Sequence, residues 1–204
     1  LTELLKKEQP SMIGFSLNYL SQALCTFAMI GFLKREWTGI KLVLGGGLVT
    51  SWMRRPHWQN PFKGLVDHLV AGPGEAPLLS LMGVTQSTDI LYKPNYNSLP
   101  IRDYFAPGPI LPYSSSSGCY WNRCSFCPER AEGNPYVAIP VEEVILDLLH
   151  LVDTQKPVLI HLLDNAISPS LMKAISEHPP GVPWYGFARI THHLTDLDFC
   201  LALR

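Results

Sequence analysis

Residues 40–47 read IKLVLGGG, a short apolar run that ends in three glycines, and residues 65–75, LVDHLVAGPGE, follow the same pattern. A third apolar run lies at residues 12–17. Segments compatible with helices follow at residues 19–34 and 75–83. Short apolar strands that end in glycine-rich loops and alternate with helices are typical of a parallel sheet covered by helices. The sequence therefore predicts an α/β fold.

A second alternation of helices and strands follows in the C-terminal half. Apolar runs at residues 157–163 and 183–189 predict two more strands. Helices are predicted at residues 140–154 and 169–178, and another begins near Thr195. Two glutamates fall in the first turn of the first of these helices, where the helix dipole favours negative charge. This half is therefore expected to form a second α/β unit.

Residues 84–112 lie between the two series and show no sustained periodicity. They contain five prolines, which disfavour both helices and central strands. We therefore expect a first domain at residues 1–83, a proline-rich linker at residues 84–112 and a second domain at residues 113–204. The five prolines are Pro94, Pro100, Pro107, Pro109 and Pro112.

The composition of the 204 residues excludes several classes of protein. Lys and Arg number 16 against 17 Asp and Glu, so the chain has no net basic charge for nucleic acid or for an anionic membrane surface. Hydrophobic residues make up 47% of the chain, which excludes disorder. Charged residues make up only 16%, against about 25% in an ordinary soluble domain. We therefore expect neither nucleic acid nor a membrane as a partner.

The cysteine count and the N-terminal sequence indicate a cytoplasmic protein. Five cysteines are an odd number, which disfavours a secreted disulfide framework. Residues 11–33 carry no charge and are long enough to cross a bilayer, yet five polar side chains interrupt them. A buried strand followed by a packed helix explains this segment better than a membrane span.

The chain begins at Leu1 and stops within a helical pattern, so we also expect it to be an internal fragment of a longer protein.

Three of the five cysteines, Cys119, Cys124 and Cys127, lie within nine positions in the segment GCYWNRCSFCPE. Thiolates are ligands for soft metals, and three of them in one loop are spaced as in a metal site. A structural zinc site normally has four protein ligands, and a 4Fe–4S cluster has four irons to ligate. Three cysteines therefore leave one coordination position open for a substrate or cofactor. The other two cysteines, Cys25 and Cys200, lie in apolar helical stretches and are expected to be buried.

This cysteine segment resembles that of the radical SAM enzymes, whose usual spacing is C-x3-C-x2-C with an aromatic residue before the third cysteine. Phe126 stands at the aromatic position, and the resemblance implies that it helps to bind S-adenosylmethionine. The chain departs from the pattern by one residue, since four residues separate Cys119 from Cys124. The resemblance implies a 4Fe–4S cluster that cleaves S-adenosylmethionine reductively, at the mouth of a partial (β/α) barrel. It also implies an external electron donor, such as a flavodoxin or a ferredoxin, and a small-molecule or peptide substrate that the sequence does not identify.

Three further residues resemble cofactor contacts of that family, at the carboxyl ends of barrel strands where such active sites lie. Asp164 and Asn165 follow the predicted strand at 157–163, and Arg189 follows the next strand. The resemblance implies that they help to hold S-adenosylmethionine, with Arg189 paired to its carboxylate. For Asp164 a turn residue is an equal alternative, and for Arg189 a surface ion pair is one.

The first half resembles the domain that precedes the barrel in the cobalamin-binding branch of that family. Segments that begin at Gly14, Leu44 and Val66 resemble its strand ends, and glycines at such ends let a backbone approach a nucleotide tail closely. The resemblance implies a partial Rossmann-like cobalamin-binding domain at residues 1–83 and the first strands and helices of a radical SAM barrel at residues 113–204. Its motif D-x-H-x-x-G, whose histidine ligates cobalt, does not occur here. The implied cobalamin contacts are Ser16, Gly45, Gly46, Gly47, Gly72, Gly74 and Glu75.

Two functions therefore stand as hypotheses. The first is a radical SAM enzyme, with a cobalamin-dependent methyl transfer or a related radical reaction among its outcomes. The alternative is a non-catalytic α/β binding module that zinc or an iron–sulfur cluster stabilises. Metal content distinguishes them, because one equivalent of zinc without iron favours the module.

Overall fold

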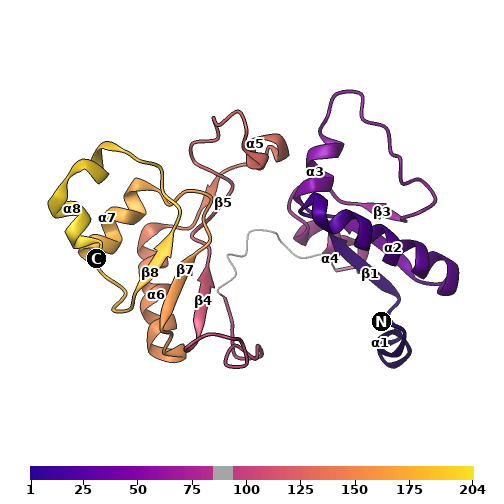
Figure 1. The fold of residues 1–204 in the computed structure, drawn as a ribbon, viewed down its shortest axis with the longest axis horizontal. Helices are drawn as coiled ribbons and strands as arrows, with labels where there is room; N and C mark the ends of the chain where they lie inside the picture. Colours follow the sequence, from indigo (N-terminus) through magenta and orange to yellow (C-terminus); the bar gives the residue numbers. More distant parts are fainter. Residues whose placement is uncertain (85–93) are drawn as a thin grey trace. The chain divides into compact units, whose positions relative to one another are not determined.

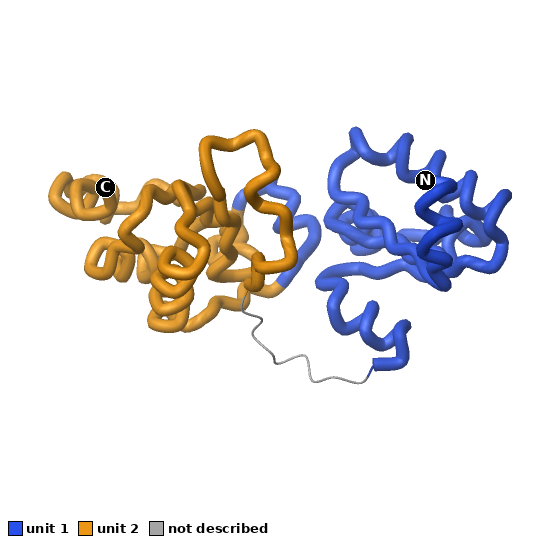
Figure 2. The backbone as a smooth tube through the Cα atoms, turned by 90° about the horizontal axis from the view of Figure 1, so that it is seen from below, with its two compact units in different colours: residues 1–88, 124–134 blue, residues 89–123, 135–204 orange. Residues whose placement is uncertain are grey.

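A computed structural model describes residues 1–84 and 94–204 of the chain. The part of the expected linker at residues 85–93 lies outside the described residues. The chain divides into two compact units, which we describe separately: residues 1–88 with 124–134, and residues 89–123 with 135–204 (Figure 2). Both units are mixed α/β with parallel sheets, as the sequence predicts.

The first unit is built on a three-stranded parallel sheet in the order β1–β2–β3 (Figure 1). Phe15 of β1 pairs with Leu44 of β2, and Leu44 in turn pairs with Leu69 of β3. The third strand has only two residues, His68 and Leu69, out of the seven in the apolar run at residues 65–71. The strands and helices of this unit are α1 (Thr2–Glu8), β1 (Met12–Ser16), α2 (Leu20–Glu36), β2 (Lys41–Gly45), α3 (Gly47–Met53), β3 (His68–Leu69), α4 (Glu75–Leu81) and α5 (Pro128–Glu132).

Helix α2 forms where the sequence offers a cap and a long apolar stretch. The Gln22 side chain accepts hydrogen bonds from the backbone N–H groups of Asn18 and Tyr19, which closes the first turn. Its buried residues, Ile30 and Leu33, pack in one core with Leu42 and Leu44 of the sheet, and the segment 11–33 thus forms β1 and most of α2. Among the described residues no helix is both long enough and apolar enough to cross a bilayer.

The second unit has a parallel sheet in the order β4–β7–β8 and a short antiparallel pair, β5–β6. Its first strand begins at Ile110, within the segment expected to be a linker, because residues 110–113 alternate between exposed and buried positions as an edge strand does. The elements are β4 (Ile110–Tyr113), β5 (Ser116–Ser117), β6 (Val137–Ala138), α6 (Val141–Gln155), β7 (Leu159–Leu162), α7 (Pro169–Glu177), β8 (Trp184–Gly186), a 3₁₀ turn (His192–Thr195) and α8 (Leu197–Ala202).

One face of the β4–β7–β8 sheet forms the core of this unit. Leu111, Tyr113, Ile160 and Leu162 point to it and are covered by helices α6 and α7 (Figure 1). Helix α7 begins at Ser168, whose hydroxyl accepts a hydrogen bond from Leu171 N, with proline in the first turn. Buried residues from α6 and α7 complete the core: Val144, Ile145, Leu148, Leu151, Leu171, Met172 and Ile175.

The other face of the same sheet is only partly covered in the described part of the chain. His161 and Tyr185, paired in register on β7 and β8, stack with ring centroids 4.1 Å apart and an interplanar angle of 12°. Tyr185 remains 46% exposed, and Ile110 on β4 remains 38% exposed. Parallel sheets are normally buried on both faces, so the partial exposure of Tyr185 and Ile110 leaves apolar surface that a ligand or another segment could contact.

Candidate functional site

The cysteine segment leaves the second sheet at the carboxyl end of β4. Its base is closed by the pairing of Ser116 with Ala138 and of Ser117 with Val137, and Ile139 N donates to Ser115 O at 2.9 Å. Gly118 follows at once with φ +72°, and a Cβ there would lie 2.5 Å from the carbonyl oxygen of Pro135. The loop therefore requires glycine at its first position, because the returning backbone passes against it.

Asp164 fastens this base to the end of β7. Its carboxylate is 2% exposed and accepts hydrogen bonds from Ser115 N at 3.1 Å and from the hydroxyls of Ser115 and Ser116, each at 2.6 Å. Hydrogen bonds to a charged acceptor are stronger than neutral ones. The structure thus places Asp164 in the support of the loop base.

Asn165, the next residue, lies closer to the cysteines. Its Nδ2 donates to Gly118 O at 3.3 Å, one residue before Cys119. Asp164 and Asn165 therefore act on consecutive parts of one loop, the first on its base and the second on its entry into the cysteine segment.

Arg189, which follows β8, reaches the same loop from a third strand. The guanidinium carbon of Arg189 lies 3.4 Å from the centroid of the Trp121 ring, and that of Arg123 lies 5.0 Å from it. Such cation–π contacts stabilise by roughly 0.5–2 kcal/mol, depending on burial. A guanidinium that stacks through its flat face keeps its in-plane N–H groups for other partners. Arg189 can therefore hold Trp121 and bind a carboxylate at the same time.

The three cysteines are free and partly exposed. The expectation that Cys25 and Cys200 are buried is wrong, because Cys25 is exposed and Cys200 is partly exposed. Cys119 belongs to the second unit, whereas Cys124 and Cys127 belong to the first. Cys127 N donates to Cys124 O at 3.3 Å. Cys127 is also the N-cap of α5, whose first residue is Pro128. Phe126, between them, is 87% exposed. Across residues 1–84 and 94–204, no group of three or more Cys, His, Asp or Glu side chains converges as a metal site.

The donor set nevertheless fits a 4Fe–4S cluster by its chemistry. All three thiols are free of disulfides and partly accessible, and thiolates are the usual ligands of such clusters. Tyr120 lies beside Cys119 with its buried hydroxyl unpaired among the described residues, and its ring meets Tyr136 edge-on at 6.3 Å. An aromatic wall of this kind would exclude water from one side of a cluster. The structure therefore brings together the residues that support the cysteine loop, and it does not bring together the three cysteines that would ligate the cluster.

The glycines predicted to contact cobalamin do gather at the carboxyl edge of the first sheet. Gly45 ends β2, where a Cβ would lie 3.2 Å from Val70 O. Gly46 has φ +101°, and a Cβ there would lie 2.6 Å from Leu17 N and O. These two glycines thus serve close approaches between segments of the chain itself.

Gly47, Gly72 and Ser16 of that edge are also engaged by their own chain. Gly47 N donates to Asn18 Oδ1 at 2.9 Å, and a Cβ on Gly47 would meet the carboxylate of Glu132. Gly72 N donates to Thr50 Oγ1 at 3.0 Å. Gly74 and Glu75 start α4, and Ser16 Oγ accepts from Asn18 Nδ2 at 3.2 Å.

This edge does not fit a corrinoid, because the space at Gly46 and Gly47 is filled. Helix α5 contacts α3 there, Arg54 Nη1 donates to Gly133 O at 2.7 Å, and Asn134 Nδ2 donates to Glu132 Oε2 at 3.1 Å. Burial, with the carboxylate of Glu129 close by, raises the pKa of Glu132. We therefore derive no reaction step through cobalamin.

Sequence reasoning missed Ser115, Ser116 and the stacked His161–Tyr185 pair as parts of the site. The serine run at 114–117 is visible in the sequence, but nothing there shows that a buried carboxylate lies opposite it. The alternation in the strands could have placed His161 and Tyr185 on one face, since His161 lies between two buried positions of β7 and Tyr185 is the exposed position between two half-buried ones of β8.

A scan against models of known protein families finds no match to this chain, and a search of curated proteins finds none.

Proposed function

We propose that this chain carries the cluster-binding part of a radical SAM enzyme. In this proposal Cys119, Cys124 and Cys127 ligate a 4Fe–4S cluster, and S-adenosylmethionine is its second cofactor. The observation that carries the proposal is the support of the cysteine loop by groups at the carboxyl ends of three adjacent parallel strands. Those groups are Ser115 after β4, Asp164 and Asn165 after β7, and Arg189 after β8.

The position of these groups supports a catalytic edge rather than a structural knuckle. In parallel α/β folds and barrels, ligands bind at the carboxyl ends of the strands, where loops from several strands converge. A structural zinc site normally has four protein ligands, whereas the cysteine segment supplies three thiolates. An open fourth position suits a cluster that binds a cofactor.

Each residue of this edge has a defined part in the proposal. When bound, the cluster supplies the electron that cleaves S-adenosylmethionine. Asp164 holds the base of the loop, and Asn165 orients the carbonyl of Gly118 just before Cys119. Arg189 holds Trp121 of the loop through the cation–π contact and offers its in-plane N–H groups to the methionine carboxylate of the cofactor.

The substrate side of this edge is the open face of the sheet. His161 and Tyr185 lie there as a stacked pair, and His161 Nε2 is buried without a partner among the described residues. We propose this face for the substrate, a small molecule or a peptide, and an external one-electron donor of the flavodoxin or ferredoxin type. Cobalamin stays outside the proposed steps for the reason given above.

The test is anaerobic reconstitution of the chain with iron and sulfide, followed by reduction in the presence of S-adenosylmethionine. We expect a brown protein that releases methionine and 5′-deoxyadenosine. A variant with Cys119, Cys124 and Cys127 all changed to alanine should lose both colour and products. The matched control changes Cys25 and Cys200, the cysteines outside the motif, and should keep both.

Two results would overturn the proposal. One is colour and cleavage that persist in the triple variant. The other is a protein that takes up one equivalent of zinc and no cluster, which would favour the binding module.

A further inference from the structure

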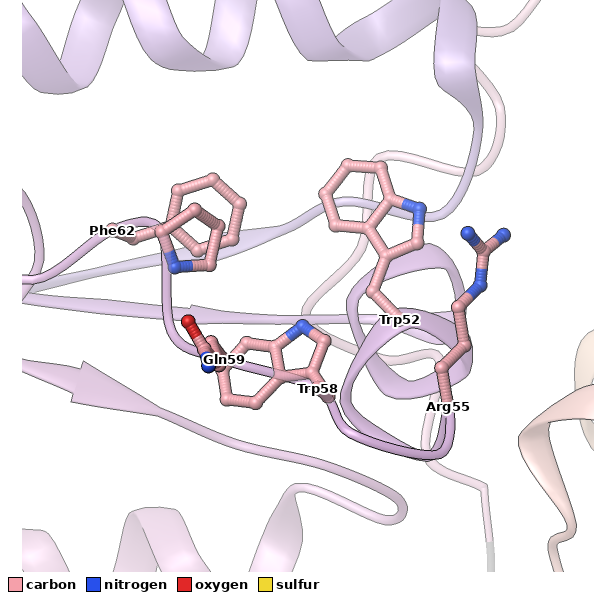
Figure 3. Close-up of a pocket in the computed structure, with 6 residues that line it drawn as sticks. Trp52, Arg55, Trp58, Gln59 and Phe62 are labelled. Atoms are coloured by element: carbon pink, nitrogen blue, oxygen red, sulfur yellow. The ribbon is translucent and has the colours of Figure 1, made fainter.

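A pocket lies in the first unit, in the loop that follows α3, far along the sequence from the cysteines. It has a volume of about 370 Å³, which is within the range of small-molecule sites. Figure 3 shows the rings of Trp52, Trp58 and Phe62 around one central space, with Arg55 at its rim and Gln59 on the opposite side. Nothing in the proposed function uses this pocket.

The walls of the pocket are held by the core of the unit. Phe62 stacks on Phe27 of α2 with ring centroids 5.0 Å apart, and it meets Trp52 at 6.0 Å. Trp52 lies on the last turn of α3. Phe27, Trp52 and Phe62 all pack against the buried core of the first unit. A ligand would therefore meet aromatic faces that are already in position, which lowers the entropy lost on binding.

The loop that carries the remaining wall is turned back by its own backbone. Arg55 N donates to Trp52 O at 3.1 Å, and Trp58 N donates to Arg55 O at 3.2 Å. Between them His57 adopts a left-handed conformation with φ 58°. This tight turn returns the chain so that Trp58 and Arg55 line the same space.

The charge of the pocket selects the kind of ligand. Arg55 and Gln59 are its polar lining residues, and no carboxylate lines it. The segment 54–63, RRPHWQNPFK, has three Lys or Arg residues and no acidic residue. Arg55 is exposed and forms no ion pair within the described residues. A cation such as a quaternary ammonium would meet this positive charge, so aromatic rings here do not form a cage for cations.

We infer that this Trp52–Phe62 pocket binds a small planar aromatic anion, of the class of purine nucleoside monophosphates. The indole and phenyl faces stack on the ring system, Arg55 pairs with the phosphate or carboxylate, and the Gln59 amide hydrogen-bonds the edge of a heteroaromatic ring. The inference is independent of the cluster and of the proposed function.

The experiment is a titration of the full chain with AMP, adenosine and ribose 5-phosphate, followed by the NMR signals of the five tryptophan indole N–H groups. AMP should shift the signals of Trp52 and Trp58 and leave those of Trp121 and Trp184 unchanged. Adenosine lacks the anion and ribose 5-phosphate lacks the ring, so each should bind about tenfold or more weakly than AMP.

Variants separate the two parts of the site. Arg55→Gln and Trp58→Leu should each weaken AMP binding by about tenfold. Arg35→Gln, which removes an exposed arginine on α2 that pairs with Glu36 at 2.6 Å, should leave it unchanged. Arg55 is on the surface, so Arg55→Gln reports on binding even if Trp58→Leu fails to fold.

The inference is wrong if AMP shifts no indole signal of the pocket, or if Arg55→Gln binds AMP like the unmodified chain. It is also wrong if adenosine or choline binds as tightly as AMP. The inference is overturned as well if a five-nucleotide oligoadenylate binds more than about tenfold tighter than AMP, because the ligand would then be a single-stranded nucleic acid and not a mononucleotide.

Discussion

A single oxygen of Asp164 accepts hydrogen bonds from two neighbouring hydroxyls, Ser115 Oγ and Ser116 Oγ, each at 2.6 Å. This relationship joins the end of β7 to the base of the cysteine loop across 48 residues of sequence. Because the carboxylate is buried, the loop and the strand are held in one arrangement before any cofactor binds.

Replacing Asp164 by alanine should destabilise the chain by about 2–4 kcal/mol, because it leaves buried donors on Ser115 without an acceptor. The measurement is the urea midpoint followed by far-UV circular dichroism. Asp153→Ala, at an exposed carboxylate paired with Lys156, is the matched control and should leave the midpoint unchanged. Equal midpoints for the two variants would contradict the supporting role of Asp164.

Gly46 should not tolerate a side chain. A Cβ there would lie 2.6 Å from backbone atoms of Leu17, and the residue has φ +101°. We expect Gly46→Ala to cost about 2–4 kcal/mol of unfolding free energy, measured by urea denaturation. Gly39→Ala is the control, since a Cβ on Gly39 meets nothing within 4 Å. If the two variants have the same stability, the close approach of α3 to the end of β1 does not exist in solution.

Asp67 should make the first unit sensitive to acid. Its pKa is lowered first by the hydrogen bond from Leu42 N at 2.7 Å and then by Lys34, whose Nζ lies 2.9 Å away. A carboxyl whose pKa is lower in the folded chain stabilises it above the unfolded pKa of 3.8, and this contribution is lost as the pH falls through the folded pKa.

Asp67→Asn should therefore lower stability near neutral pH by about 1 kcal/mol, a value reduced for partial exposure, and flatten the decline below pH 5. Urea midpoints from about pH 7 to about pH 3 test this. Glu36→Gln, at an exposed carboxylate on the same unit, should keep the full decline. A variant curve parallel to that of the unmodified chain would exclude the role of Asp67.

Tyr113 should make the second unit sensitive to alkali. Burial, together with the nearby Asp147 carboxylate, raises its pKa well above the usual value of 10.0. The folded chain therefore holds a proton that the unfolded chain releases, so stability is complete below pH 10 and falls as the pH rises above it.

Tyr113→Phe should make the urea midpoint less dependent on pH above about 10, although the loss of the hydrogen bond to Asp147 lowers stability by about 1 kcal/mol at neutral pH. Tyr104→Phe, at a tyrosine that is 69% exposed, is the control and should keep the alkaline decline. An unchanged decline in Tyr113→Phe would show that other groups, Tyr96 among them, cause it.

The sequence by itself determined the order and type of the main elements. Strands at 12–17 and 40–44 and helices at 19–34, 140–154 and 169–178 appear close to their predicted bounds. Hydrophobic periodicity, capping groups and prolines act over a few residues, so they can be read locally. The cysteine spacing is equally local, and the cluster, S-adenosylmethionine and radical chemistry that it suggests stay predictions.

Tertiary structure alone decided what supports the cysteine loop and what fills the glycine-rich edge. Asp164 and Ser115 are 49 residues apart and are joined by two hydrogen bonds, and Arg54 and Gly133 are 79 residues apart and are joined by one. Local patterns do not encode such meetings, because they depend on which strand ends share an edge of a sheet. For the same reason the glycines at residues 45–47 read as a cofactor cradle in the sequence and as contacts of the chain with itself in the fold.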